Sequence, residues 1–107
     1  MTSYRDLIVW QKSMSLVTLI YQLVLVLPEN EKFGLTPQIK RSAISIPSNI
    51  AEGYGRNYKK DYARFLQIAR GSLFENQTQL EIAVNLNFIK SDDLKEIKEL
   101  SIEVKKC

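Results

Sequence analysis

The chain of 107 residues contains no histidine and a single cysteine, Cys107. Without histidine, the Ser-His and Cys-His nucleophile pairs are excluded, and so are the Glu-x-x-His metal ligands of di-iron helical bundles. A lone cysteine has no partner for an intrachain disulfide, which agrees with a reducing compartment. We therefore expect no enzyme, no cofactor and no bound metal.

Long apolar runs are also missing. The longest, residues 16–27, is interrupted by Thr18 and Gln22 and is shorter than the roughly 20 residues that cross a bilayer. The amino terminus lacks the basic region, apolar core and cleavage site of a signal peptide. These features predict a cytoplasmic protein without a membrane span, in which residues 16–27 form a buried helix.

The overall charge is small, but it is unevenly distributed. Apolar residues make up 45% of the chain and charged residues 25%, an ordinary globular composition for one domain. The net charge is +3, yet residues 38–70 hold seven bases and two acids, whereas residues 71–104 hold three bases and seven acids. We expect a basic middle and an acidic last third.

Apolar residues recur at steps of three and four along four segments, the spacing of one helix face. The segments span about residues 6–27, 37–53, 58–87 and 92–105, and no alternating run indicates a strand. Short loops make successive helices antiparallel. The sequence therefore predicts one all-α domain over residues 1–107, an antiparallel up-down-up-down four-helix bundle.

Prolines, glycines and capping residues mark the expected helix ends. Pro28 stops the first helix, and Gly53 with Gly55 marks the end of the second. The expected N-caps of the later helices are Thr36, Asn57, and Ser91 or Asp92. Pro47 lies inside the second helical pattern, and we expect a bend there but no break, because the apolar spacing resumes in phase.

The first helix carries more apolar surface than a seam with one neighbour needs, and the last helix is the shortest. Together these features predict an incompletely covered core and association with further copies of the chain. The residues expected in the core or the oligomer interface are Trp10, Val17, Ile20, Tyr21 and Leu23.

Polar residues within the apolar stripes are expected to fix the helix register. Asn49 and Asn76 interrupt two such stripes, and we expect them to bond each other or nearby backbone. Ion pairs across the helices are expected for two acids, Glu52 and Glu75, with Arg41, Arg56 or Arg70.

A basic strip is the feature best suited to a function. Arg56, Lys60 and Arg64 recur every four residues, a spacing that places them on one helix face. Such a strip contacts phosphates without reading sequence, although a solvated helix face with ion pairs has the same pattern. The predicted nucleic-acid-binding set adds Arg41 and Lys59 to these three.

Several runs together resemble one protein family. They are Leu-Ile-Val-Trp-Gln-Lys at residues 7–12, Gly34-Leu35, Ser-Ile-Pro-Ser-Asn-Ile-Ala-Glu-Gly at residues 45–53 with Gly55-Arg56, and Gly71-Ser72-Leu73 with Glu75. The chain is similar over nearly its whole length to the four-helix bundle proteins encoded in intervening sequences of bacterial 23S ribosomal RNA. The motif residues that this resemblance marks are Pro47, Asn49, Glu52, Gly53 and Glu75.

The resemblance implies an up-down bundle that assembles into a ring-like homo-oligomer, with a pentamer expected. The family is also similar to the accessory variability determinant of diversity-generating retroelements, whose implied role is binding nucleic acid and a reverse transcriptase through a basic surface. The expected function is therefore a non-enzymatic, homo-oligomeric bundle protein that binds RNA or DNA. A protein-interaction scaffold without nucleic-acid binding is the alternative.

Overall fold

The computed structural model describes residues 3–107, so the first two residues of the predicted domain lie outside the described residues. Its four helices are α1 (Ile8–Leu23), α2 (Leu35–Tyr54), α3 (Lys59–Asn85) and α4 (Lys95–Lys106). Short 3-10 turns occupy Tyr4–Asp6, Val24–Val26, Glu29–Glu31 and Ser91–Leu94. Residues 3–107 contain no strand, and the predicted all-α class is confirmed.

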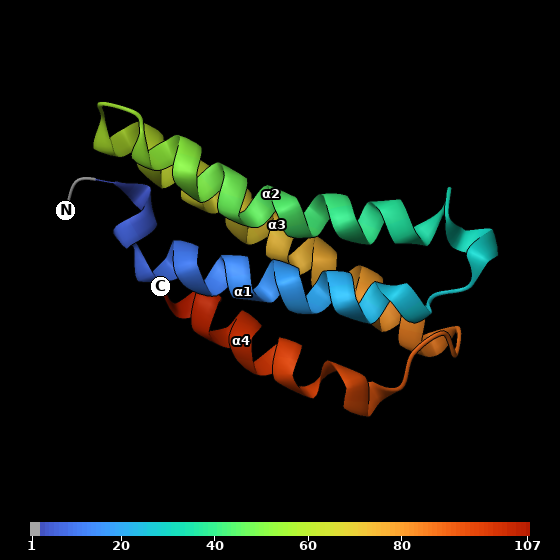
Figure 1. The fold of residues 1–107 in the computed structure, drawn as a ribbon. Helices are drawn as coiled ribbons and strands as arrows, with labels where there is room; N and C mark the ends of the chain where they lie inside the picture. The colour runs from blue at the N-terminus through green and yellow to red at the C-terminus, as the bar shows by residue number, and fades with distance from the viewer. Residues whose placement is uncertain (1–2) are drawn as a thin grey trace.

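The helices run alternately up and down the long axis of the molecule, as an up-down-up-down bundle requires (Figure 1). α1 packs against α2 and α4, and α2 packs along α3, whereas α3 and α4 touch over a much shorter stretch. The turn between α2 and α3 lies at the same end as the C-terminus and extends past the end of α4 (Figure 1).

One face of each helix supplies the hydrophobic core. Its most deeply buried side chains are Leu16, Ile20, Ile39, Ile46, Ile50, Leu73, Leu80 and Leu94. Among the residues predicted for the core or an interface, Ile20 is completely buried. Trp10, Val17, Tyr21 and Leu23 are half-buried, which places them at the border between core and surface.

A layer of buried hydrogen bonds crosses the interface between α2 and α3. The Asn76 amide donates to the Ile39 carbonyl and to Ser42 Oγ, both at 3.0 Å. The Ser42 hydroxyl lies 2.7 Å from its acceptor, Gln79 Oε1. Every fully buried side-chain nitrogen or oxygen in residues 3–107 has such a partner. Because a slip of either helix would leave these groups unpaired, the layer favours a single alignment.

The two asparagines that were expected to fix register act differently. Asn76 bonds backbone of the neighbouring helix, as predicted. Asn49 instead donates within its own helix, to the Ser45 carbonyl at 2.8 Å, and does not bond Asn76. The Ser45 hydroxyl meets that of Ser72 at 2.7 Å, and this contact links α2 to α3.

Gly53 is a point of close contact near the end of α2. It is buried in the last turn of α2, which ends at Tyr54 with Gly55 as its C-cap, so the predicted helix end at Gly53 and Gly55 is confirmed. A β-carbon at Gly53 would lie 2.6 Å from Phe65 Cβ and 3.2 Å from the Tyr62 ring. Only glycine therefore lets α3 approach α2 this closely.

Pro47 is also buried inside α2, and the helix continues through it without a break, as predicted. The expected bend at Pro47 stays a prediction.

The predicted start of α2 is wrong. α2 begins at Leu35, directly after Gly34, so Thr36 lies in the first turn and caps nothing. The Leu35 N–H is satisfied by Glu31 Oε1 at 3.0 Å. The preceding loop thus supplies the cap.

The starts of α3 and of the last helical segment also differ from the prediction. Tyr58, not Asn57, is the N-cap of α3. A 3-10 turn precedes α4, and the N-cap of this turn is Lys90 instead of Ser91 or Asp92. The Lys90 N–H donates to Asp93 Oδ2 at 2.9 Å.

The apolar first helix is buried on one side only. By length and composition, Ile8–Val26 is long and apolar enough to cross a membrane, and 22% of it is buried. A core helix passes the same test, and Leu16 and Ile20 do face the core. Leu25 and Val26, however, are 80% and 63% exposed. The prediction that residues 16–27 are buried is therefore correct for the face that packs on the core and wrong for the outer face. The absence of a membrane span stays a prediction.

The core is open beside the C-terminal end of α4. A cavity of about 280 Å³ lies there between Leu66 and Leu73 of α3 and Val104 of α4. Its position agrees with the expectation that the short last helix leaves the core incompletely covered.

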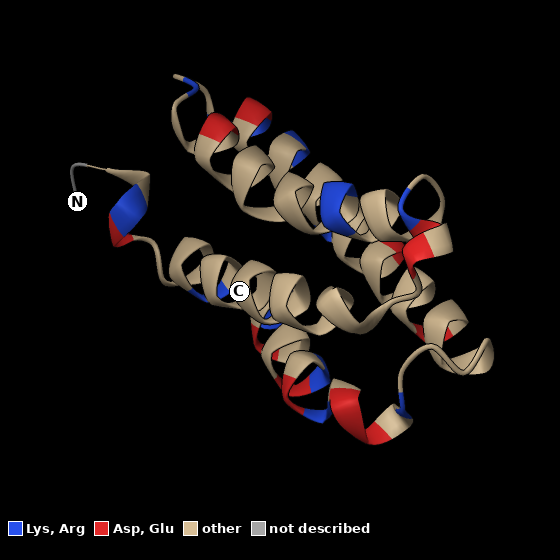
Figure 2. Cartoon of the chain, turned by 45° about the vertical axis from the view of Figure 1, so that its right-hand side comes forward, with Lys and Arg blue, Asp and Glu red and all other residues tan. Residues whose placement is uncertain are grey.

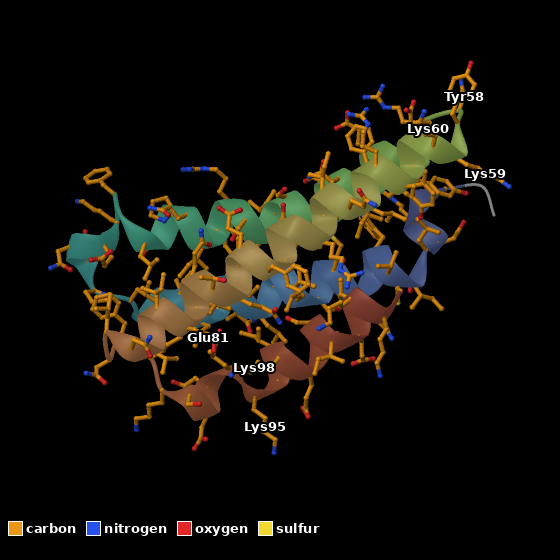
Figure 3. The ribbon with its side chains drawn as sticks, turned by 180° about the vertical axis from the view of Figure 1, so that it is seen from behind. Tyr58, Lys59, Lys60, Glu81, Lys95 and Lys98 are labelled. Carbon is orange, nitrogen blue, oxygen red and sulfur yellow. The ribbon has the colours of Figure 1, made fainter. Side chains whose placement is uncertain are left out.

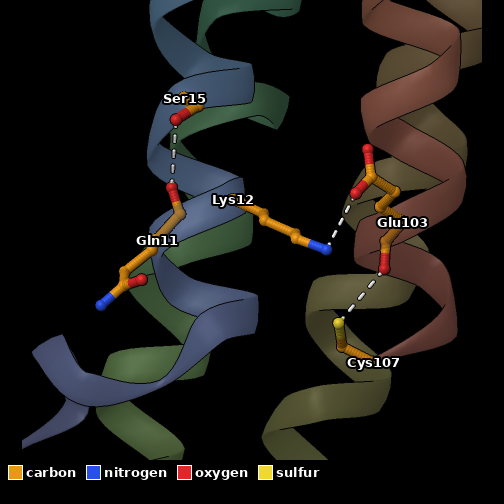
Figure 4. Close-up of polar contacts among 5 residues, drawn as sticks. All are labelled: Gln11, Lys12, Ser15, Glu103 and Cys107. Carbon is orange, nitrogen blue, oxygen red and sulfur yellow. Dashed lines mark hydrogen bonds and ion pairs between the residues drawn. The ribbon is translucent and has the colours of Figure 1, made fainter.

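An ion pair joins α4 to α1 (Figure 4). Lys12 Nζ lies 2.8 Å from Glu103 Oε1, and the Cys107 thiol donates to the Glu103 carbonyl at 3.2 Å. The hydrogen bond to Glu103 raises the pKa of Lys12 above its ordinary value, burial opposes the rise, and the Glu103 charge supports it.

Replacement of Gly53 should destabilise the bundle. Gly53→Ala forces a methyl group against Phe65, and overpacking of this kind costs about 1–3 kcal/mol. Gly71→Ala is the matched control, since it also lies inside a helix but has open space around the added carbon; it should gain about 0.5–1 kcal/mol. Urea unfolding measures both. Equal effects of the two changes would contradict the close contact.

The Lys12–Glu103 pair should add stability that is lost in strong alkali. Because the folded protein holds the Lys12 proton more tightly than the unfolded chain, the contribution is complete below the ordinary lysine pKa and disappears as pH rises through the raised pKa. The difference in melting temperature between the wild type and Glu103→Gln should therefore narrow above about pH 10.4. A constant difference across this range would be inconsistent with the pair.

Candidate functional site

The charges of the bundle are separated in space. Acidic residues gather on the last helical segment, with lysines between them (Figure 2). A second group of charges, in which basic residues outnumber the acids Glu52 and Asp61, flanks the turn between α2 and α3. We call the set Arg56, Tyr58, Lys59, Lys60 and Arg64 the basic tip.

Arg56 joins the basic tip in a different way from that predicted. It lies in the turn before α3 begins at Lys59, so it does not share a helix face with Lys60 and Arg64. The Arg56 and Arg64 guanidinium groups instead both lie 5.0 Å from the centre of the Phe65 ring. This aromatic ring, which is 7% exposed, brings the two arginines together by cation–π attraction.

Most cations of the tip have no acidic partner. Three ion pairs form in the described part of the chain, Lys12–Glu103, Lys32–Glu29 and Arg56–Glu52. Lys59, Lys60 and Arg64 are exposed and take part in none of them. Lys59 and Lys60 extend from the tip, whereas Lys95 and Lys98 lie on α4, away from the tip (Figure 3). Three exposed cations are thus available to an anion.

Arg41 does not belong to the basic tip. It lies on α2, fifteen residues before Arg56, which is about 20 Å along a helix axis. It borders a shallow depression that Glu75 also lines, but the two form no ion pair. The structure therefore divides the predicted nucleic-acid-binding set and leaves Arg41 outside.

The predicted ion pairs of Glu52 and Glu75 are corrected in part. Glu52 Oε2 lies 2.9 Å from Arg56 Nη2, so the partner is among those predicted, but the pair spans one helical turn and does not cross between helices. Glu75 pairs with no arginine and accepts a long hydrogen bond, 3.4 Å, from Gln79 Nε2. Glu75 thus lies at the end of the layer of buried hydrogen bonds that links α2 to α3.

Two aromatic rings pack against each other near the basic tip. Tyr54 and Tyr62 meet edge to face, with ring centres 6.0 Å apart. Burial is the larger cause that raises the pKa of Tyr62, and the nearby Tyr54 adds to it, so the phenol stays neutral and is unsuited to be a general base.

In residues 3–107 no three Cys, Asp or Glu side chains are placed to hold a metal ion.

A second surface feature is a shallow apolar groove between α1 and α2. Val17, Tyr21, Leu25 and Ile44 line it, together with the more polar Thr18 and Gln22. Two of the predicted interface residues, Val17 and Tyr21, therefore lie in one groove. Trp10 lies apart from it and packs its ring against Tyr4 at 5.2 Å.

Tyr58 is the residue of the tip that sequence reasoning missed. The side chain is 71% exposed, and it projects from the turn away from the bundle (Figure 3). Its signal in the sequence is its place between Arg56 and the pair Lys59-Lys60, outside every apolar stripe.

The fold and the site define a four-helix bundle with a basic tip and an apolar groove. The chain belongs to the 23S rRNA-intervening sequence protein family, whose model matches residues 5–107. The predicted family is thus confirmed, and the similarity to the accessory variability determinant stays a prediction.

The chain is similar over nearly its whole length to a solved structure. It is the crystal structure of a protein with unknown function from the S23 ribosomal protein family of Bacteroides thetaiotaomicron. The two sequences are 26% identical, the match covers 92% of this chain and 93% of the other, and the TM-score is 0.81. No curated protein matches the chain.

Proposed function

We propose that the chain is a subunit of a cytoplasmic, homo-oligomeric bundle protein without enzymatic activity, which binds RNA or DNA through the basic tip. The observation that carries this proposal is the group of exposed cations, Lys59, Lys60 and Arg64, without acidic partners in the described residues. Such cations gain free energy by replacing the counterions of a phosphate backbone.

The separation of charge supports a defined orientation on the nucleic acid. The turn before α4 and α4 itself hold five of the twelve acids beside four lysines, so that side of the bundle attracts phosphates less than the basic tip does. The family name refers to 23S rRNA, and structured RNA is accordingly the first substrate to test.

Assembly would strengthen the binding. A single tip offers few phosphate contacts and binds weakly, whereas several tips on one oligomer engage the same polymer together and gain by avidity. The proposed interface between subunits is the α1–α2 groove, because Leu25 at 80% exposure and Ile44 at 45% lose contact with water when a second copy covers them. A pentamer is the expected form.

A protein-interaction scaffold is the second candidate function, favoured by apolar side chains exposed away from the groove. Phe33, for example, is 89% exposed in the loop before α2. The partner would be a reverse transcriptase or another protein, and its binding would not depend on the cations of the basic tip.

Charge reversal at the tip should weaken nucleic-acid binding. We expect the wild type to bind structured RNA in fluorescence anisotropy at about 50 mM salt, with an affinity that falls as salt rises. The double change Lys59→Glu and Lys60→Glu should weaken this binding and lower the salt slope by about 2, because two phosphate contacts are lost.

The matched control reverses Lys95 and Lys98, two exposed lysines of α4 that give the same change in net charge. It should leave binding nearly unchanged. Equal losses in the two double variants would show that only net charge matters and would reject the tip as the site.

A charge in the groove should dissociate the oligomer. Ile44→Glu places a carboxylate in the proposed interface, and burying it there without a partner is unfavourable. Ile102→Glu on α4 is the control, since Ile102 is 46% exposed and Ile44 is 45% exposed. Light scattering after size-exclusion chromatography should give a smaller mass for Ile44→Glu alone. Dissociation by Ile102→Glu alone would place the interface elsewhere.

A further inference from the structure

Tyr58 has no evident structural role in the bundle. Its ring is 71% exposed, whereas the neighbouring rings are packed, Tyr54 against Tyr62 and Phe65 under two arginines. As the N-cap of α3 it makes no side-chain cap hydrogen bond, and tyrosine is not among the residues that cap helices well. An exposed aromatic residue that neither packs nor caps is available for a ligand.

The ring is nevertheless held on a well-defined backbone. The turn between α2 and α3 is short, and hydrogen bonds hold its backbone at both ends. The Arg56 N–H donates to the Gly53 carbonyl at 3.1 Å, and the Tyr62 N–H donates to the Tyr58 carbonyl at 3.2 Å. These bonds hold Arg56, two residues before Tyr58, and the Tyr58 carbonyl itself. Its side chain therefore projects from a fixed point, which limits the conformational entropy lost when a flat ligand covers it.

Cations surround this ring on both sides along the chain. Arg56 precedes it by two residues, and Lys59 and Lys60 follow directly. Arg56 is held by Glu52 and by the Phe65 ring, so the two lysines are the freer phosphate contacts. A flat aromatic face beside several cations is what single-stranded nucleic acids require, since bases stack on the ring while phosphates meet the cations.

We infer that Tyr58 is a stacking platform for an unpaired base, so that the basic tip takes single-stranded segments or loops in preference to a duplex. This inference rests on the proposed nucleic-acid binding and names its substrate class. In a duplex the base faces are already stacked on one another, and the deep, narrow major groove of RNA excludes side chains, whereas unpaired bases are free to stack on a protein aromatic side chain.

The test compares three labelled probes of equal length by fluorescence anisotropy at about 50 mM salt. They are a single-stranded RNA, the same RNA annealed to its complement, and a single strand that carries abasic sites in place of its bases. The wild type should bind the first probe most tightly. Tyr58→Ala should weaken binding to that probe by roughly 5- to 100-fold, as loss of one base stack does.

Two comparisons separate stacking from a structural effect. Tyr58→Ala should bind the abasic strand as the wild type does, because that probe offers phosphates but no base to stack. Tyr58→Phe, which keeps the ring and loses the hydroxyl, should bind the single-stranded RNA nearly as well as the wild type.

The outcomes that overturn the inference differ from those that overturn the proposed function. If Tyr58→Ala binds the single-stranded RNA as tightly as the wild type, or loses affinity equally for the abasic strand, Tyr58 is no stacking platform. The proposed function then still stands, provided that the Lys59 and Lys60 reversal weakens binding to all probes. If the wild type binds none of the probes in a salt-dependent way, both are overturned.

Discussion

The buried amide of Asn76 and its partners on α2 are the contact on which the rest of the bundle depends. Burial of apolar side chains is non-directional and does not by itself select one alignment of two long helices. The bonds from Asn76 to the Ile39 carbonyl and to Ser42 Oγ remove that freedom, because any other alignment leaves buried polar groups unpaired. Gly53 completes the constraint by allowing Phe65 to lie directly against α2.

The position of the basic tip follows from this alignment. The tip is carried by the turn between the two helices that the polar layer joins, and this turn extends past the end of α4 (Figure 1). Lys59 and Lys60 are therefore exposed on a rigid hairpin, away from the acids of α4. The apolar groove lies on a different part of the bundle, between α1 and α2, so a subunit can be covered at the groove while its tip stays open.

Much of this fold could be predicted from the sequence, because the spacing of apolar residues determines which faces of the helices are buried. The number, order and class of the helices followed from that spacing alone. The details that the spacing does not show depend on contacts between distant residues. Gly53 lies at the expected helix end, but its close contact with Phe65 of the next helix has no signal in the sequence. Arg56 was placed on α3 by its spacing, yet it reaches Arg64 through the Phe65 ring. Tyr58 lies outside every apolar stripe, but that position does not show whether its ring packs against a neighbour, as those of Tyr54 and Tyr62 do, or is exposed.

The central claim is that α2 and α3 form the most stable unit of the bundle and hold the basic tip. Hydrogen–deuterium exchange of the backbone amides in the wild type measures this stability segment by segment. The account predicts that the slowest amides lie in α2 and α3 around Ser42 and Asn76, and that the amides of α4 exchange faster. Slowest exchange in α1 or α4, with early opening of the α2–α3 hairpin, would contradict it.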